Sequence, residues 1–205
     1  AGVDREAKGA TLTPIYQSSA FEQDTAADLE KIFENKAPGF CYTRVGNPTV
    51  AAFENRITKL EGGMASIACA SGMAAIMNAI LNIVRSGDEI VSSASLYGGS
   101  IDLFRDIEEF GITTRYVKNN DWEAIEEAIN EHTRLIFAET IGNPCLDVTD
   151  VERLAQIAHE HKIPLILDNT TATAYLFQGI KHGADIVVNS SSKYINGSSN
   201  SISGI

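Results

Sequence analysis

The chain has 205 residues, of which 44% are hydrophobic and 21% charged, the balance of a globular protein that is long enough to bury a core. Its formal net charge of -11 argues against a nucleic-acid partner, because phosphate backbones are bound by clustered Lys and Arg. No apolar run approaches the roughly 20 residues that cross a bilayer, so we expect no membrane partner.

The cysteines and the first residues bear on the compartment. Cys41, Cys69 and Cys145 lie far apart without a CxxC pair, and residues 1–8 lack the apolar core of a signal peptide. We therefore expect no disulfide framework and a cytoplasmic location.

The first part of the chain differs in character from the rest. Residues 1–47 are irregular, are interrupted by prolines, and carry one short helical pattern near 26–33, so we expect an N-terminal arm. Helical spacing of apolar residues then runs to Glu61, and Gly62 follows as a helix C-cap would. We assign residues 48–205 to a separate domain.

Short β-like runs alternate with helical patterns through this domain. The expected strands are 65–70, 89–92, 113–117, 135–138, 165–167 and 186–188, and the expected helices between them are 72–84, 100–110, 122–131 and 151–161. Thr149 with Glu152 three residues later predicts a capping box for the last helix. The alternation predicts a three-layer α/β fold, a mostly parallel sheet with helices on both faces.

Ligands bind at the carboxyl ends of the strands in such a sheet. Polar or glycine-rich residues follow the expected strands at Ser71-Gly72, Ser93 to Tyr97, Glu139 to Asn143, Asp168 to Thr170, and Ser190 to Lys193. The chemistry is therefore expected on one edge of the sheet. No GxGxxG pattern indicates a dinucleotide, and the four histidines show no metal spacing, so we expect no metal.

Asp168 and Lys193 have the most specific chemistry of these residues. Each follows an apolar run, and three serines precede Lys193. A buried carboxylate, a buried amine and nearby hydroxyls are what pyridoxal phosphate (PLP) needs, because the amine bonds to its aldehyde, the acid pairs with its ring nitrogen and the hydroxyls hold its phosphate. Taken singly, Asp168 is equally typical of a helix cap, and Lys193 is more typical of a solvated surface lysine.

Three other motifs also allow a purely structural interpretation. Ser71-Gly72 before an apolar helix is typical of an anion site or of an ordinary N-cap. Tyr97 before two glycines can lie over a planar cofactor or in a surface turn. Arg44 can bind a phosphate or make a surface salt bridge, and the sequence alone does not choose.

These motifs form one ordered set along the chain. Its segments are Pro14 to Ser19, Tyr42-Thr43-Arg44, Asn47-Pro48-Thr49, Leu60 to Gly63, Ala70 to Ala75, Leu96 to Gly99, Glu139 to Pro144, Asp168 to Thr170, and Gly183 to Val188 with Ser190 and Lys193-Tyr194. Together they resemble the Cys/Met metabolism family of PLP-dependent enzymes, the trans-sulfuration group. Residues 90–99 are most similar to the O-acetylhomoserine sulfhydrylases of that family.

The resemblance implies the large domain of a type I PLP-dependent transferase and assigns roles to its residues. Lys193 bonds to the cofactor and moves protons, and Tyr97 stacks on the ring and assists proton transfer or departure of the leaving group. Asp168 keeps the ring nitrogen protonated, Asn143 contacts the ring oxygen or the substrate, and Thr170 lines the site.

The resemblance also implies how the phosphate is held. The ligands within the chain are Ser71, Gly72, Met73, Ser190 and Ser192, the last standing where the family usually has threonine. Tyr42 and Arg44 reach the phosphate of a neighbouring subunit, which implies a homotetramer built from dimers.

The implied activity is γ-replacement on an O-acylated homoserine with sulfide or a thiol, giving homocysteine or methionine. Cystathionine γ-synthase, cystathionine lyase and methionine γ-lyase activities remain open, as does a non-catalytic fragment. Since the chain ends at Ile205, about half the family's span, we expect it to lack the C-terminal domain with its substrate-binding arginine and to be inactive alone.

Overall fold

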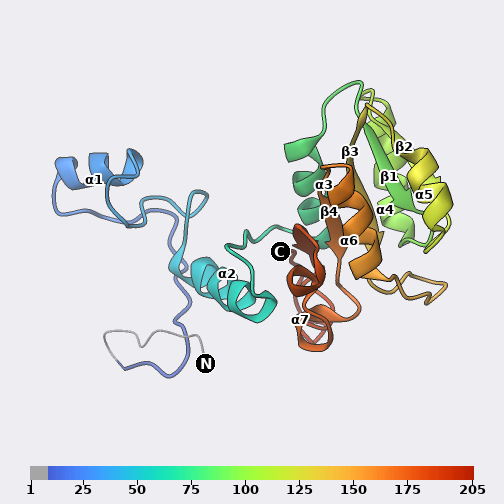
Figure 1. The fold of residues 1–205 in the computed structure, drawn as a ribbon. Helices are drawn as coiled ribbons and strands as arrows, with labels where there is room; N and C mark the ends of the chain where they lie inside the picture. Colours follow the sequence, from blue (N-terminus) through green and yellow to red (C-terminus); the bar gives the residue numbers. More distant parts are fainter. Residues whose placement is uncertain (1–8) are drawn as a thin grey trace. The chain divides into compact units, whose positions relative to one another are not determined.

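The computed structural model describes residues 9–205 and divides the chain into two compact units, Ala1–Lys59 and Leu60–Ile205 (Figure 1). The first unit contains helix α1 (Ala26–Phe33), which matches the expected helix, and most of helix α2 (Pro48–Glu61). Its irregular segments are joined by Asn47, whose side-chain Nδ2 donates to the Tyr16 carbonyl at 2.9 Å.

The second unit is built on a five-stranded sheet in which every pairing is parallel. Its strands are β1 (Glu89–Ser93), β2 (Thr113–Val117), β3 (Thr133–Glu139), β4 (Leu165–Asp168) and β5 (Ile186–Val188), in the order β2-β1-β3-β4-β5. The predicted α/β class and its parallel sheet are confirmed.

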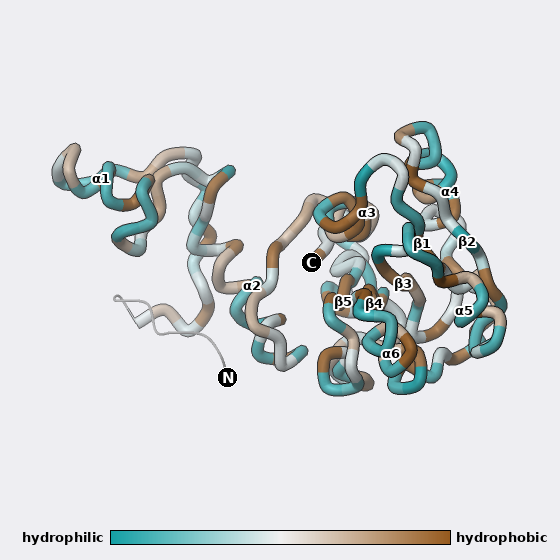
Figure 2. The backbone as a smooth tube through the Cα atoms, turned by 45° about the horizontal axis from the view of Figure 1, so that its top comes forward, coloured by the Kyte–Doolittle hydropathy of each residue, from teal (hydrophilic) through white to brown (hydrophobic). Residues whose placement is uncertain are grey.

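Helices cover both faces of the sheet (Figure 1). One layer contains α3 (Gly72–Ile83) and α4 (Gly98–Glu108), and the other contains α5 (Trp122–Ala128) and α6 (Val151–Glu160). Alternate residues of the inner strands enter opposite cores: Leu135 and Phe137 of β3 pack with α3 and α4, whereas Ile136 and Ala138 pack with α5 and α6. Burial on both faces explains the continuous apolar runs, whose colour in Figure 2 gathers on α3 and on β3 to β5.

Two short elements carry no signal that the sequence analysis could use. These are α7 (Thr173–Leu176) and the 3-10 helix η1 (Gly179–His182), each of four residues. One turn of helix is too short to show a periodic pattern of apolar residues.

The prediction of a strand at 65–70 is wrong. Only Cys69 makes a bridge there, exchanging two 2.8 Å backbone hydrogen bonds with Gly204, and no ladder forms. A run of β-forming residues becomes a strand only where a partner segment lies along it, and here the partner is in register at a single residue pair.

The capping box expected at Thr149 is also wrong. Helix α6 is capped by Asp150, whose carboxylate accepts from the Arg153 N–H at 3.1 Å. The Thr149 hydroxyl instead donates to the Glu139 carbonyl at 2.6 Å. A tertiary partner at the end of β3 thus outweighs the local cap.

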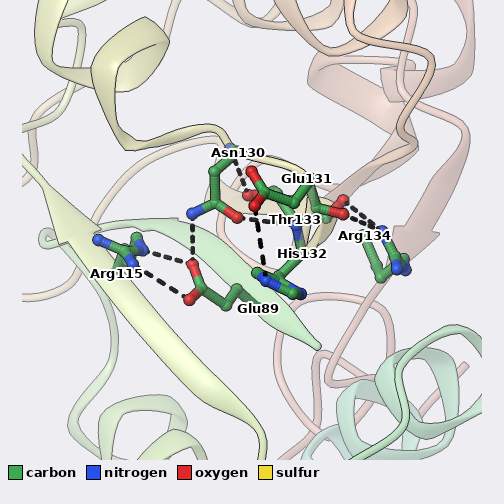
Figure 3. A network of polar contacts seen from close by, with 7 residues as sticks. All are labelled: Glu89, Arg115, Asn130, Glu131, His132, Thr133 and Arg134. Atoms are coloured by element: carbon green, nitrogen blue, oxygen red, sulfur yellow. Dashed lines mark hydrogen bonds and ion pairs between the residues drawn. The ribbon is translucent and has the colours of Figure 1, made fainter. Parts of the chain in front are cut away.

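A polar network closes the amino edge of the sheet (Figure 3). The Glu89 carboxylate on β1 accepts from the Arg115 guanidinium on β2, with Nη2 at 3.1 Å, and from Asn130 Nδ2 at 2.7 Å. The hydrogen bond from Arg115, then that from Asn130, lowers the pKa of Glu89 to about 2. The network joins β1, β2 and the segment that precedes β3.

Replacing Glu89 by Gln is expected to lower the free energy of unfolding near neutral pH by about 1–2 kcal/mol, because Arg115 loses its anionic partner. Since the pKa of Glu89 is lowered, this contribution is complete above the ordinary value of 4.5 and is lost as the pH falls through about 2.

Urea denaturation of the full-length protein and its Glu89→Gln variant, at neutral pH and at successively lower pH, measures the difference. The control is Glu109→Gln, at an exposed residue that follows α4. A difference for Glu89→Gln that persists unchanged toward pH 2 would contradict the assignment.

Candidate active site

Asp168 lies at the carboxyl end of β4 and is half-buried. One carboxylate oxygen, Oδ1, accepts from the Thr170 N–H at 2.9 Å and from the Thr170 hydroxyl at 2.5 Å. Within residues 9–205 its other oxygen, Oδ2, has no hydrogen-bond partner. Burial raises the pKa of Asp168, and the two bonds from Thr170 oppose the rise. The Oδ2 atom of Asp168 is therefore a suitable acceptor for a cationic N–H donor, because the protein stabilises the charge of this carboxylate only in part.

Thr170 links Asp168 to the end of the neighbouring strand. The Thr170 hydroxyl, which donates to Asp168, also accepts from the Ser190 N–H at 2.7 Å. Because β4 and β5 are parallel neighbours, with Asp168 opposite Val188, their carboxyl ends lie side by side. Thr170 thus fixes the carboxylate and the Ser190 backbone in one arrangement.

The start of α3 packs against the same serine. A Cβ placed on Gly72 would lie 2.6 Å from the Ser190 Cβ and 2.8 Å from its Cα, so only glycine allows this approach. Ser71 caps α3 by accepting from the Ala74 N–H at 3.1 Å, and its hydroxyl hydrogen has no acceptor among residues 9–205.

The first turn of α3 leaves backbone donors unpaired within residues 9–205. In the described part of the chain, the N–H groups of Gly72 and Met73 have no acceptor. Free N–H groups at the start of a 12-residue helix, together with its dipole, favour an anion such as phosphate. Ser71, Gly72, Met73 and Ser190 are thus brought together as expected.

Tyr97 and Asn143 both donate a backbone N–H to the carboxylate of Glu139, a residue to which the sequence had assigned no role. Glu139, at the end of β3, accepts from the Tyr97 N–H at 2.6 Å through Oε1 and from the Asn143 N–H at 3.2 Å through Oε2. The Tyr97 ring is half-exposed and lies against Gly99, where a Cβ would come within 2.5 Å of a ring carbon. The available signal was an acid at a strand end inside the matching segment Glu139 to Pro144.

Glu139 is an unusual carboxylate. It is 5% exposed, and burial raises its pKa to about 7, with the nearby charges of Asp168 and Asp147 adding to the rise. The two backbone hydrogen bonds, from Tyr97 and Asn143, act in the opposite direction. The register of β3 and β4 places Glu139 opposite Asp168.

Lys193 is exposed, so the expectation of a buried amine is wrong for this chain. The apolar run ends at Val188, and Lys193 lies in the following turn, where its N–H donates to the Ser190 carbonyl at 3.2 Å. Its carbonyl accepts from the Gly197 N–H at 2.8 Å. The backbone is held in a turn by these bonds, which place the side chain outside both apolar cores.

The remaining expected site residues make other contacts. The Ser192 hydroxyl donates to the Ser203 carbonyl at 3.2 Å and accepts from the Ser203 N–H at 2.9 Å, so its hydrogen is engaged. Tyr42 and Arg44 lie in the first unit, where the Arg44 guanidinium stands 5.4 Å from the centre of the Tyr42 ring. Their assignments stay predictions.

The residues present fit pyridoxal phosphate. The free N–H groups of α3 and the Ser71 hydroxyl suit its phosphate, and the unpaired oxygen of Asp168 suits its protonated ring nitrogen. Across residues 9–205, no three His, Cys, Asp or Glu side chains are grouped to hold a metal ion. No helix in that range has the length and apolar character to cross a membrane.

Comparison with known proteins gives a consistent result. Residues 1–205 match the family model described as Cys/Met metabolism PLP-dependent enzyme. An O-acetyl-L-homoserine sulfhydrylase of Corynebacterium glutamicum is 43% identical over 99% of this chain and 47% of its own length. An L-methionine gamma-lyase of Fusobacterium nucleatum is 38% identical over 100% of this chain and 52% of its own. The chain thus spans about half the length of these curated relatives.

Solved structures share the fold. The crystal structure of a putative O-acetylhomoserine (thiol)-lyase from Campylobacter jejuni has a TM-score of 0.95 and 36% identity, covering 100% of this chain and 51% of that one. That structure contains N'-pyridoxyl-lysine-5'-monophosphate. A cystathionine gamma-lyase from Lactobacillus plantarum has a TM-score of 0.90 and 38% identity, covering 99% of this chain and 51% of its own.

Replacing Gly72 by Ala is expected to push the start of α3 away from Ser190, at a cost of about 1–3 kcal/mol in stability, and to weaken phosphate binding. Denaturation and PLP titration of the full-length protein measure both effects. The control is Gly63→Ala, where the nearest atom to a new Cβ is 3.9 Å away. Equal behaviour of the two variants would contradict the close packing of Gly72 on Ser190.

Proposed function

Because the chain belongs to the Cys/Met metabolism family of PLP-dependent enzymes, we propose that the protein replaces the γ-substituent of an O-acylated homoserine with sulfide or a thiol. The products are homocysteine or methionine. The observation that carries the proposal is the connected group of Asp168, Thr170, Ser190 and the start of α3, which offers one acceptor for a cation and several donors for an anion.

The residues of this chain divide the work of cofactor binding between two ends. The Ser71 hydroxyl and the N–H groups of Gly72 and Met73 bind the phosphate, and the Ser190 side chain lies beside them. Asp168 accepts from the ring nitrogen and holds a proton there, since a cation in a poorly solvated site favours the charged carboxylate. When bound, PLP withdraws electrons from the carbon that bears the substrate's amino group.

The other predicted residues act on the substrate side. Lys193 would bond to the cofactor and carry protons between substrate carbons. Its turn follows the end of β5, where its N–H donates to the Ser190 carbonyl at 3.2 Å. Tyr97 covers the cofactor ring and assists the leaving group, and Asn143 contacts the ring oxygen or the substrate. Thr170 lines the site and orients Asp168.

Sulfhydrylase activity is favoured because relatives in two bacteria bear that name at 42–43% identity. γ-Elimination from methionine is the second candidate, supported by relatives named L-methionine gamma-lyase at 38% identity. The two reactions share the cofactor-binding residues.

We further propose that the protein works in the cytoplasm as a homotetramer built from dimers. Tyr42 and Arg44 lie in the first compact unit and are proposed to reach the phosphate of a neighbouring subunit. An Arg guanidinium held over an aromatic ring keeps its outer N–H groups free for a phosphate.

Reduction of the full-length protein with borohydride is expected to attach a pyridoxyl group to Lys193, and Lys193→Ala is expected to lower turnover by roughly 10²–10⁴-fold. Peptide mass spectrometry identifies the modified residue. The control is Lys181→Ala, at an exposed lysine in η1. Modification of a different lysine, or normal turnover by Lys193→Ala, would overturn the assignment.

Product analysis separates the two candidate reactions. With O-acetylhomoserine and sulfide the full-length protein is expected to form homocysteine, and to do so faster than it degrades methionine or cystathionine. The rates with the separate substrates are measured under the same conditions by chromatography. Release of methanethiol from methionine as the fastest reaction would favour the lyase and contradict the sulfhydrylase.

A further inference from the structure

Glu139 is placed between two loops that carry predicted site residues. One loop follows β1 and ends at Tyr97, and the other follows β3 itself and contains Asn143. Each carboxylate oxygen accepts one backbone N–H, at 2.6 Å from Tyr97 and 3.2 Å from Asn143. One side chain therefore joins residues that are 42 and 4 positions away in the sequence.

The burial of the Glu139 carboxylate has to be offset by interactions that stabilise it. Glu139 is 5% exposed, and a buried carboxylate is costly unless it is hydrogen-bonded. The charged groups that face it are Asp168 on β4 and Asp147 in the loop after β3, and both disfavour its ionised form. The two backbone N–H donors favour the ionised form. They offset part of the free-energy cost of burying the carboxylate, and they do so only while the two loops stay in place.

The residues held by these bonds are otherwise open to solvent. Tyr97 is 50% exposed, and Asn143 is exposed. Tyr97 precedes α4 without capping it through its side chain, so the bond from its N–H to Glu139 ties the entry of that helix to the sheet. Glu139 accepts the backbone N–H of both residues, and the Tyr97 carbonyl in turn accepts from the Ser100 N–H at 2.9 Å.

We propose that Glu139 is a positioning residue that holds Tyr97 and Asn143 over the cofactor site through their backbone N–H groups. This inference rests on the proposed function, in which Tyr97 covers the cofactor ring and Asn143 contacts the ring oxygen or the substrate. Glu139 has no proposed contact with the cofactor or the substrate. It holds the two loops that do, together with the hydrogen bond that the Ser95 hydroxyl of one loop donates to Asp147 of the other. Its role requires both oxygens as acceptors and the full length of a glutamate side chain.

The unaltered full-length protein gives the first test, by hydrogen–deuterium exchange resolved to single residues. The N–H groups of Tyr97 and Asn143 are expected to be protected in both the cofactor-free and the cofactor-loaded protein. Cys145, in the same loop as Asn143, has no acceptor for its N–H in the described part of the chain and is the internal control. Exchange at Tyr97 and Asn143 as fast as at Cys145 would overturn the proposal without any variant.

Two variants of Glu139 then test separately the number of acceptor oxygens and the length of the side chain. Glu139→Gln keeps the length but presents an NH₂ to one of the two donors, and Glu139→Asp keeps the charge but is one methylene shorter. Each is expected to speed exchange at Tyr97 or Asn143, and to weaken PLP binding by about tenfold through the loss of a charge-assisted hydrogen bond. Exchange at the Leu167 N–H in β4 is expected to stay unchanged.

The control variant is Glu127→Gln, on the exposed side of α5. Glu139 variants that match it in exchange and in PLP affinity would overturn the positioning role. Faster exchange at Leu167 as well would indicate a general structural role instead. If the unaltered protein binds no PLP, the proposed function fails, whereas exchange in the cofactor-free protein still decides the role of Glu139.

Discussion

The parallel pairing of β3 with β4 ends in two carboxylates, because their register sets Glu139 opposite Asp168 at the carboxyl edge. Both strands are buried on their two faces, so neither can slip by one residue without moving apolar side chains out of the cores. The apolar packing therefore fixes where the two acids lie. Each acid then organises a different set of loops: Glu139 binds Tyr97 and Asn143, and Asp168 binds Thr170.

The two acids thus divide the site into two parts. The outer part is the pair of loops that Glu139 binds through Tyr97 and Asn143. The inner part runs from Asp168 through Thr170 to Ser190, and Gly72 brings the start of α3 against it. Its donors and acceptors suit a molecule with an anion at one end and a cation at the other. The amino edge of the sheet is different. There the Glu89 carboxylate is paired with Arg115 and Asn130, so these groups stabilise the fold. Chemistry at one edge and stability at the other is the division expected of a parallel α/β sheet.

Much of this arrangement could be predicted from the sequence, because strands buried on both faces leave unbroken apolar runs. The group of Asp168, Thr170 and Ser190 followed from the rule that strand ends meet at one edge. Ser71 and Gly72 were expected there after a strand that does not form, and it is the packing of Gly72 on Ser190 that brings them to the group. What failed depended on tertiary partners: residues 65–70 find only one bridging residue, and Thr149 bonds to the β3 backbone instead of capping α6. The exposure of Lys193 and the double hydrogen bonding of Glu139 could not be foreseen either, since neither leaves a periodic pattern in the chain.

The most direct test of the account is a crystal structure of the full-length protein with pyridoxal phosphate. The account predicts the ring nitrogen within hydrogen-bond distance, about 2.7–3.2 Å, of Asp168 Oδ2, and the phosphate against the N–H groups of Gly72 and Met73. A cofactor whose ring nitrogen faces another residue, or whose phosphate lies away from the start of α3, would contradict it.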